Sequence, residues 1–284
     1  ETALPVVILA LLLGQLEQVR NVGWLLYDSG LRSRVSADIE DVVLVGITND
    51  DVNWLQKPFP WGRDEQSVIY EKIVEQNPAV VAVDLLYTEP SNDEADLRLA
   101  RELAACGKNI GAFYFDEGQF GAPSETQQRL LSESGNLLGA DLSLREWLQP
   151  SARPKLPTDA IASGLTRVGH VHTEPDGDGV IRRVPLLLSD GEQLYPALVL
   201  QTVLLHWDVD WSQVRASPHE ISIANVPNRG MVRIPLDGAG NLLVAFPTKT
   251  DERFLGVDIE TLMTGPELPP MEGKLILVGS LLTG

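Results

Sequence analysis

The sequence predicts an α/β fold: a three-layer, mostly parallel sheet flanked by helices, with an added portion rich in β-hairpins. Two observations lead to this prediction. In the first half of the chain, short and nearly continuous apolar runs alternate with helical patterns, which is typical of strands buried on both faces of a parallel sheet. In the second half, apolar runs are joined by Asp-Gly steps, which favour tight turns between antiparallel strands.

The first half is predicted to run strand, helix, strand, helix, strand. The strands are residues 42–47 and the apolar parts of NPAVVAVDLLY and NIGAFYF. The first helix covers residues 64–76, with acids in its first turn and apolar side chains on one face. The second helix begins after Asn92, a favourable N-cap, and ends at Gly107. Right-handed crossovers between parallel strands follow from this order.

The second half is predicted to contain two hairpins, an apolar helix and a final strand. RVGHVHTEPDGDGVIRRVPLLL predicts a hairpin with its tip at residues 176–179, and RIPLDGAGNLLVAFP a second hairpin around Asp237. YPALVLQTVLLHW predicts the helix. The apolar run in GKLILVGS predicts a buried strand parallel to residues 42–47 in the same sheet.

The acidic turn does not match a calcium-binding EF-hand loop. Counted from Asp176, positions 5, 6 and 12 are Val180, Ile181 and Leu187, whereas the loop needs an acid, a glycine and a glutamate there. We therefore expect a turn that binds no calcium.

Composition limits the classes of function. The chain has 284 residues, 44% of them hydrophobic, which is enough for a sizeable core. Its formal net charge of −18 argues against nucleic acid as a partner. The single cysteine, Cys106, cannot form an internal disulfide. The common dinucleotide, nucleotide, serine hydrolase and zincin motifs do not occur, and we expect no cofactor.

The N-terminal segment resembles part of a membrane span. Residues 2–16 carry no charge but are shorter than the roughly 20 apolar residues of a complete span. Trp24 and Tyr27 follow, and such aromatic residues are common at bilayer interfaces. The segment is therefore a trimmed transmembrane helix or a signal-peptide core, and the alternative is a buried core helix.

A metal site is one chemical hypothesis. His170, His172 and Glu174 alternate along the chain, so on a strand they would project from one face and could meet a metal. The alternative is that these side chains lie on the solvent face of a hairpin and bind nothing.

A ligand-binding crevice is the second hypothesis. Asp50 and Asp51 follow the first strand and Asp84 ends the second, and open α/β sheets bind ligands outside the carboxyl ends of their strands. Alternatively, Asp51 caps a turn and Asp84 pairs with Arg63 or Arg182. We expect Arg182 to point inward, with Asp84 as its first partner.

Further candidates surround this crevice. Trp61 is expected to plug the core, and Arg63 either caps the Pro-Phe-Pro-Trp corner or holds an anion. Asp178 and Arg182, from the acidic turn, complete the ligand-binding candidates.

Taken in order, the segments after about Val22 resemble the CHASE2 family of extracytoplasmic sensor domains. The resemblance covers LLYDSGLR, VVLVGITNDDV, FPWGRD, VVAVDLLYTEP and the later segments up to MEGKLILVGS. The chain departs from the family at Thr48, where many members have Asp, and at His170 and His172, which often correspond to an apolar residue and an Asn. The most specific match is carried by Pro175, Asp176, Asp178, Gly179, Val180, Arg182, Arg183 and Pro185.

The resemblance implies an input domain, periplasmic or extracellular, in a membrane receptor with a cytoplasmic kinase or nucleotide cyclase output. Residues 1–34 would be the membrane-proximal helix and residues 35–284 the sensor domain. It would be non-catalytic, bind an unknown small ligand or periplasmic partner, attach to the membrane through flanking helices and form a homodimer. After Gly284 the chain would return to the membrane from beside Asp51.

Two other functions remain open. One is a secreted or periplasmic α/β enzyme, such as a metal-assisted hydrolase using His170, His172 and Glu174. The other is a structural module that holds receptor dimers together.

Overall fold

A computed structural model describes residues 24, 39–116, 121–135, 153–189, 193–217, 219–237, 239–244, 254–265 and 267–282. The strands are β1 (Ile39–Ile47), β2 (Val80–Asp84), β3 (Asn109–Asp116), β4 (Arg153–Lys155), β5 (Arg167–His170), β6 (Arg183–Pro185), β7 (Leu187–Ser189), β8 (Leu194–Pro196), β9 (Val214–Ser217), β10 (Glu220–Val226), β11 (Gly230–Pro235), β12 (Asn241–Leu243), β13 (Phe254–Asp258) and β14 (Leu275–Ser280). The helices are α3 (Asn49–Leu55), α4 (Arg63–Val74), α5 (Asp93–Ala105), α6 (Glu125–Glu133), α8 (Asp159–Ala162), α9 (Leu198–His206) and α10 (Ile259–Thr264), with a 3₁₀ turn η1 (Trp211–Gln213).

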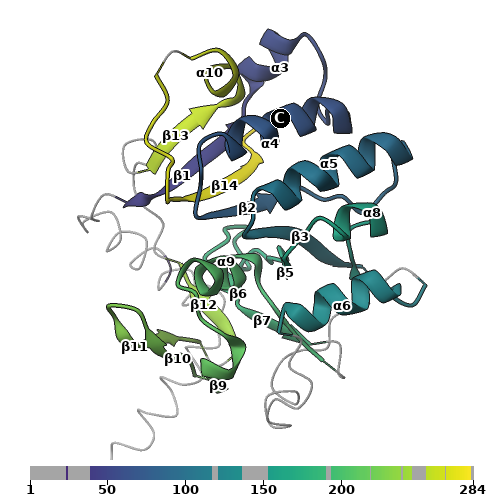
Figure 1. Cartoon of the computed structure of the whole chain (residues 1–284). Coiled ribbons are helices and arrows are strands. Elements are labelled where there is room, and N and C mark those ends of the chain that lie inside the picture. Colours follow the sequence, from purple (N-terminus) through teal and green to yellow (C-terminus); the bar gives the residue numbers. More distant parts are fainter. Residues whose placement is uncertain are drawn as a thin grey trace, which may run out of the picture.

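A mostly parallel sheet forms the centre of the described structure (Figure 1). Its order is β13-β1-β14-β2-β3, and β5 also pairs with β3 in parallel. Among the described strands, only the short β4 joins it antiparallel, at the end of β3. The predicted α/β class is confirmed, and so is the terminal strand, because β14 lies parallel beside β1.

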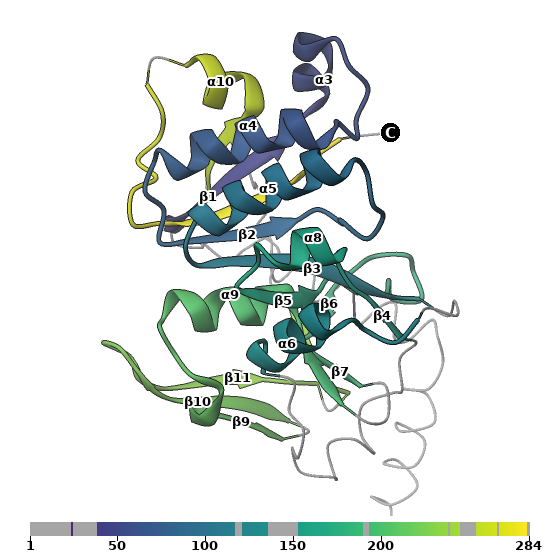
Figure 2. The same cartoon turned by 45° about the vertical axis from the view of Figure 1, so that its right-hand side comes forward.

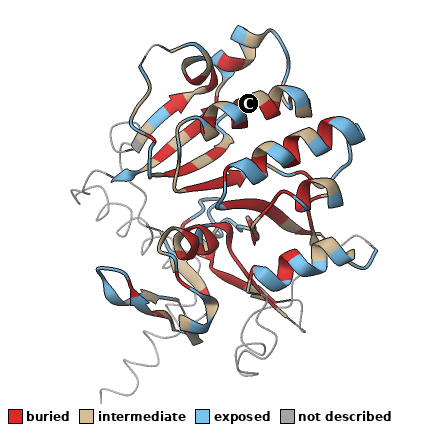
Figure 3. Ribbon diagram, in the orientation of Figure 1, coloured by how far each residue is buried: buried red, intermediate tan, exposed pale blue. Residues whose placement is uncertain are grey.

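Helices cover both faces of the sheet. Figure 2 shows α4 and α5 side by side over one face. In β2, Val81 and Val83 belong to the core under these helices, while Val80 packs with Leu198 and Leu205 of α9. Because successive strand residues point to opposite faces, α9 covers the other face. Figure 3 shows the parallel strands buried between these layers.

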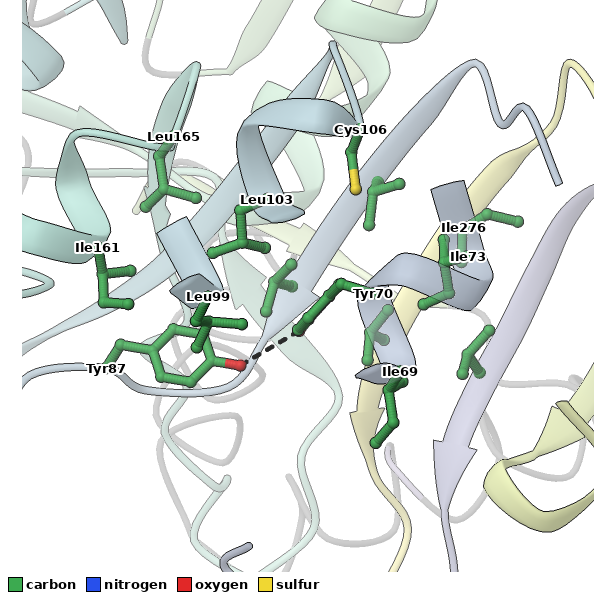
Figure 4. Close-up of a cluster of buried hydrophobic side chains, with 14 of the residues drawn as sticks. Ile69, Tyr70, Ile73, Tyr87, Leu99, Leu103, Cys106, Ile161, Leu165 and Ile276 are labelled. Carbon is green, nitrogen blue, oxygen red and sulfur yellow. Dashed lines mark hydrogen bonds between the residues drawn. The ribbon is translucent and has the colours of Figure 1, made fainter. Parts of the chain in front are cut away.

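The predicted caps and apolar stripes of the crossover helices are confirmed. The side chain of Asn92 accepts hydrogen bonds from two backbone amides of the first turn of α5, and Gly107 follows the helix with φ +71°. Leu99 and Leu103 of α5 are fully buried. In Figure 4 they face the side chains of α4. The hydroxyl groups of Tyr70 and Tyr87 lie 3.2 Å apart in this largely apolar core, and Tyr87 also donates to Oε1 of the buried Gln66 over 2.6 Å.

Helix α9 packs on two sides at once. One side joins the cluster on the parallel sheet, and the other joins a cluster with β7, β8 and the antiparallel sheet β11-β10-β9. Its one long polar side chain in the interior, Gln201, donates from Nε2 to the carbonyl oxygens of Ser134 and Val168. The predicted apolar helix is therefore mostly buried, although Val199 is exposed.

The two predicted hairpins are wrong, although the turn at residues 176–179 forms. The amide of Gly179 donates to the carbonyl oxygen of Asp176 over 2.8 Å, and Gly179 has φ +83°. The flanking strands do not pair with each other. β5 pairs with β3 in the parallel sheet, and β6 pairs with β12. The segment around Asp237 likewise connects β11 to β12, which pair with different strands. The hairpins observed are β7-β8 and β9-β10-β11.

The N-terminal prediction has no structural test. Residues 1–34, the predicted membrane-proximal helix, lie outside the described residues except for Trp24. Within the described part of the chain, no helix has both the length and the apolar composition needed to cross a membrane.

Gly169 allows β5 to approach α9 closely, and this contact gives a stability prediction. A Cβ atom at Gly169 would lie 2.4 Å from Cα of Leu198, whereas one at Gly256 in β13 would meet nothing within 4 Å. Gly169→Ala is expected to lower the free energy of unfolding by about 1–3 kcal/mol, because backbone must move to relieve the overlap. Gly256→Ala is the matched control. Equal stability of the two variants in chemical denaturation would contradict the close packing.

Candidate functional site

Asp50 and Asp51 lie in the first turn of α3, a helix that the sequence prediction missed. Thr48 and Asp51 form a capping box: the amide of Asp51 donates to Oγ1 of Thr48, and the amide of Thr48 donates to the Asp51 carboxylate. The other oxygen of Asp51 accepts from the amide of Glu260 in α10 over 2.8 Å. Asp51 thus has a capping role, in keeping with the alternative interpretation, and its contact with α10 also joins two helices. It is buried, while Asp50 is exposed.

Trp61 and Arg63 are occupied by contacts within the protein. Trp61 is buried in the core and donates from Nε1 to the carbonyl oxygen of Lys57. The guanidinium of Arg63 pairs with Asp96 over 2.8 Å and lies over the ring of Tyr87. The pair of Arg63 with Asp96 fixes α4 against α5, and the contacts of both residues favour a structural role.

Asp84 is the most open of the candidates at the carboxyl edge. It ends β2 beside Gly279 of β14 and is solvent-exposed. No ion pair to it forms among the described residues, and desolvation by its surroundings raises its pKa. The predicted pairing of Asp84 with Arg63 or Arg182 is wrong, because both guanidinium groups have other carboxylates. Asp84 therefore remains available for a ligand.

Arg182 is buried and receives its carboxylates from its own turn. Its Nη1 and Nη2 atoms each lie 2.9 Å from one oxygen of Asp178, and Nη1 lies 3.4 Å from Oδ2 of Asp176. The side chain of Arg182 is 5% exposed and that of Asp176 is 8% exposed. Hydrogen bonding to Arg182 lowers the pKa of Asp178. The inward orientation of Arg182 is as predicted, but the turn places local acids closer than Asp84.

Arg183 extends this group into a cluster, which we call the Asp–Arg cluster. Nη2 of Arg183 lies 2.7 Å from Oδ1 of Asp176, and its Nη1 lies 3.6 Å from Oδ2 of Asp237. Five residues form the cluster, including both positions of the Arg-Arg pair: Asp176, Asp178, Arg182, Arg183 and Asp237.

Trp24 contacts the Asp–Arg cluster from the N-terminal segment. The Cζ atoms of Arg182 and Arg183 lie 5.1 and 5.2 Å from the centre of the Trp24 ring. The sequence interpretation assigned Trp24 to a bilayer interface and Asp237 to a turn, so it missed both. A signal was present, because two adjacent arginines beside a buried strand need more than one acid to neutralise them.

The three metal-ligand candidates are not on one strand face, because β5 ends at His170. His170 is 1% exposed and contacts the rings of Phe113 and Phe115. His172 instead pairs with Glu174 near the surface, with 3.4 Å between Nε2 and Oε1. Among the described residues, no group of three or more His, Cys, Asp or Glu side chains could hold a metal ion. The geometric basis of the metal hypothesis is therefore wrong.

His170 is a buried neutral histidine without hydrogen bonds to its ring nitrogens from the described residues. Burial, together with the nearby His172, lowers its pKa from 6.5 to about 3. Such an unpaired polar group destabilises the fold.

The Asp–Arg cluster predicts a large effect of removing Arg182. Arg182→Ala removes the buried guanidinium that pairs with Asp178 and leaves Asp176 with Arg183 alone, so it is expected to lower the free energy of unfolding by about 1.5–3 kcal/mol. Arg233→Ala is the matched control, because Arg233 pairs with Glu220 at the surface and should contribute less than about 1 kcal/mol. Similar losses for both variants in urea denaturation would show that the cluster is not a buried ion pair network.

Replacing His170 predicts a change in pH dependence. His170→Phe keeps an aromatic ring and removes two unpaired nitrogens, so it is expected to stabilise the protein by about 1 kcal/mol or more at pH 7. The unfolded wild-type chain binds a proton at this histidine below about pH 6.5 while the folded chain stays neutral down to about pH 3, so wild-type stability falls as the pH falls through this range. The advantage of the variant should therefore grow from pH 7 to pH 5. A constant difference would contradict a neutral, desolvated His170.

The comparisons with known proteins identify a family. Neither a curated protein nor a solved structure matches the chain. One family model, the CHASE2 domain, matches residues 3–284, and this range includes Trp24, the Asp–Arg cluster and the whole parallel sheet. The chain therefore belongs to the CHASE2 family of extracytoplasmic sensor domains.

Proposed function

We propose that this chain is the ligand-sensing input domain of a membrane-bound signalling receptor and has no catalytic role of its own. The observation that supports this most is the contact of Trp24 with Arg182 and Arg183. Trp24 comes from the segment predicted to be membrane-proximal, and the two arginines come from the segment on which the sequence resemblance to the family is most specific. A contact between these two parts is what a sensor needs to pass a signal to its membrane segment.

The chemistry of this contact suits a reversible coupling. A cation over the face of a tryptophan ring contributes about 0.5–2 kcal/mol, less than the buried ion pairs that hold the arginines. Movement of the N-terminal segment can therefore break the ring contact while the Asp–Arg cluster stays intact. A ligand that prefers one of the two arrangements shifts their populations by its difference in affinity.

The parallel sheet supports the same proposal. β1 follows the N-terminal segment, β14 is the last described strand, and the two are adjacent with registered backbones from Val42–Leu275 to Ile47–Ser280. Asp84 lies one strand further along at the carboxyl edge, and it remains our candidate ligand contact there. The receptor would act as a homodimer, attached to the membrane by flanking helices and joined to a kinase or nucleotide cyclase.

The coupling is tested by a double-mutant cycle on Trp24 and Arg183 in the whole chain. Trp24→Ala and Arg183→Gln are each expected to reduce stability, and the double variant should show a coupling energy of about 0.5–2 kcal/mol. Trp54, an exposed residue of α3, provides the control: Trp54→Ala with Arg183→Gln should be additive. If the stability losses of Trp24→Ala and Arg183→Gln are additive, the two side chains are not coupled and the proposed signalling contact is wrong.

The location outside the cytoplasm is tested with the single cysteine. Cys106 is buried and desolvation raises its pKa to about 12, so a thiol reagent should not label the native chain. Leu97→Cys places a thiol on the exposed face of α5. In intact cells expressing the full receptor, a membrane-impermeant maleimide should label this variant and not the native chain. Labelling that appears only after lysis would overturn the proposed location.

A further inference from the structure

His170, the last residue of β5, lies where β3, β8 and α9 meet. The centre of its ring is 6.4 Å from that of Phe113 and 6.1 Å from that of Phe115, both in β3. The ring of Tyr195 in β8 contacts the same two phenylalanines, at 6.0 and 5.2 Å. The backbone of His170 also forms a bridge with Ala197, the N-cap residue of α9. We call His170, Phe113, Phe115 and Tyr195 the aromatic group.

The aromatic group has no place for a charged imidazole. His170 is buried, and neither of its ring nitrogens has a hydrogen-bond partner among the described residues. A protonated imidazole donates from both nitrogens, so a proton on this ring would bury a positive charge and two unpaired donors. Helix α9 begins beside it, and the positive end of the helix dipole also opposes a cation there. The observed arrangement therefore favours the neutral ring.

The titratable and charged groups around His170 do not neutralise a proton on it. They are Tyr195 on β8, Tyr114 and Asp116 on β3, Arg153 and Lys155 on β4, and the exposed Glu125, Arg129 and Glu133 on α6. None of them forms a hydrogen bond with a ring nitrogen of His170 in the described part of the chain. His172, which pairs with Glu174, adds to the effect of burial and lowers the pKa of His170 further.

The β7-β8 hairpin is the element that can uncover His170. Its strands have three residues each, and in the described structure they pair with each other and not with the parallel sheet. Leu188 and Tyr195 are opposite each other in the hairpin and pack on the core beside β3. Leu187 and Leu194 pack on the other side with α9, so the hairpin can turn about this second contact. β3 and β5 are held more firmly, because they lie in the parallel sheet.

We propose that His170 is an acid-sensitive switch: when its ring takes up a proton, the β7-β8 hairpin moves away and the charged ring reaches water. Leu186 alone separates β6 from β7, and its carbonyl oxygen accepts from the amide of Ala197 over 2.9 Å. Movement of the hairpin therefore shifts β6, and with it Arg183 and the contact of Arg183 with Trp24. The inference rests on the proposed function, because it names acid as the stimulus that the sensor detects.

The direction and size of the response follow from the two arrangements. In the open one the ring is in water with its ordinary pKa of 6.5, and in the closed one burial lowers that pKa to about 3. The closed arrangement therefore loses stability as the pH falls through this interval. Between pH 7 and pH 5 the ratio of open to closed molecules is expected to rise about 25-fold.

Native-state hydrogen exchange on the whole chain, with correction for intrinsic rates, tests the switch. The amides of Val171 and Ala197 report on it, because they donate to carbonyl oxygens across the junction. They should open at a lower free energy than the amides inside α4, with a weaker dependence on urea, and about 25-fold more often at pH 5 than at pH 7. The amide of Val244, which donates to the carbonyl oxygen of Arg182, should open with them.

Two results of this experiment would overturn the proposal. If Val171 and Ala197 open only together with α4, at the same free energy and with the same urea dependence, acid acts through global unfolding and the hairpin is no switch. If they open locally while Val244 stays protected, the movement does not reach the Asp–Arg cluster.

Matched variants assign the response to one ring. His170→Phe keeps an aromatic ring in the group and removes the nitrogens that titrate, so it should abolish the 25-fold response. His170→Leu serves the same purpose if the phenylalanine variant does not fold. His219→Gln, at an exposed position before β10, is the control and should keep the response. A response that survives both changes at His170 belongs to another group and contradicts the switch.

The exchange experiment and the cysteine labelling fail separately. If the maleimide labels Leu97→Cys from outside but acid does not open the hairpin, only the stimulus is wrong. If acid opens the hairpin but the labelling requires lysis, the switch stands and the receptor proposal falls.

Discussion

The burial of α9 on two sides is the constraint on which the rest of the structure depends. One side of the helix closes the parallel sheet and the other supports the antiparallel sheet β11-β10-β9, so a single element belongs to both hydrophobic clusters. Such a helix needs apolar side chains on both sides, and its one long buried polar side chain, Gln201, needs fixed carbonyl partners. The absence of a Cβ atom at Gly169 allows the helix to approach β5 closely.

The main charged feature of the fold is the Asp–Arg cluster. Four of its residues precede α9 in the chain, and Asp237 follows it. In the cluster, carboxylates neutralise buried guanidinium groups and a tryptophan ring covers them. The ion pairs within the cluster are typical of a fixed structural contact, whereas the ring contact of Trp24 is weaker.

The sequence predicted local structure well and pairing partners poorly. The continuous apolar runs of β1, β2 and β14 and the Asn92 cap depend on neighbouring residues, so they could be recognised. The partners of β6 and of Arg182 could not be recognised. Several strands could have paired with β6, and several acids could have paired with Arg182. The capping box of Asp51 was considered only as an alternative, since a capping acid and a ligand-binding acid have the same sequence signal.

Native-state hydrogen exchange on the whole chain tests the role of α9 most directly. If both clusters depend on this helix, the amides of Leu200 to Leu205 should exchange only through global unfolding, together with those of β2 and β3. The amides of β10 should open at a free energy equal to or lower than that of α9, and not at a higher one. Exchange of α9 at a clearly lower free energy than β2, with β10 still protected, would show that the two halves hold together without it.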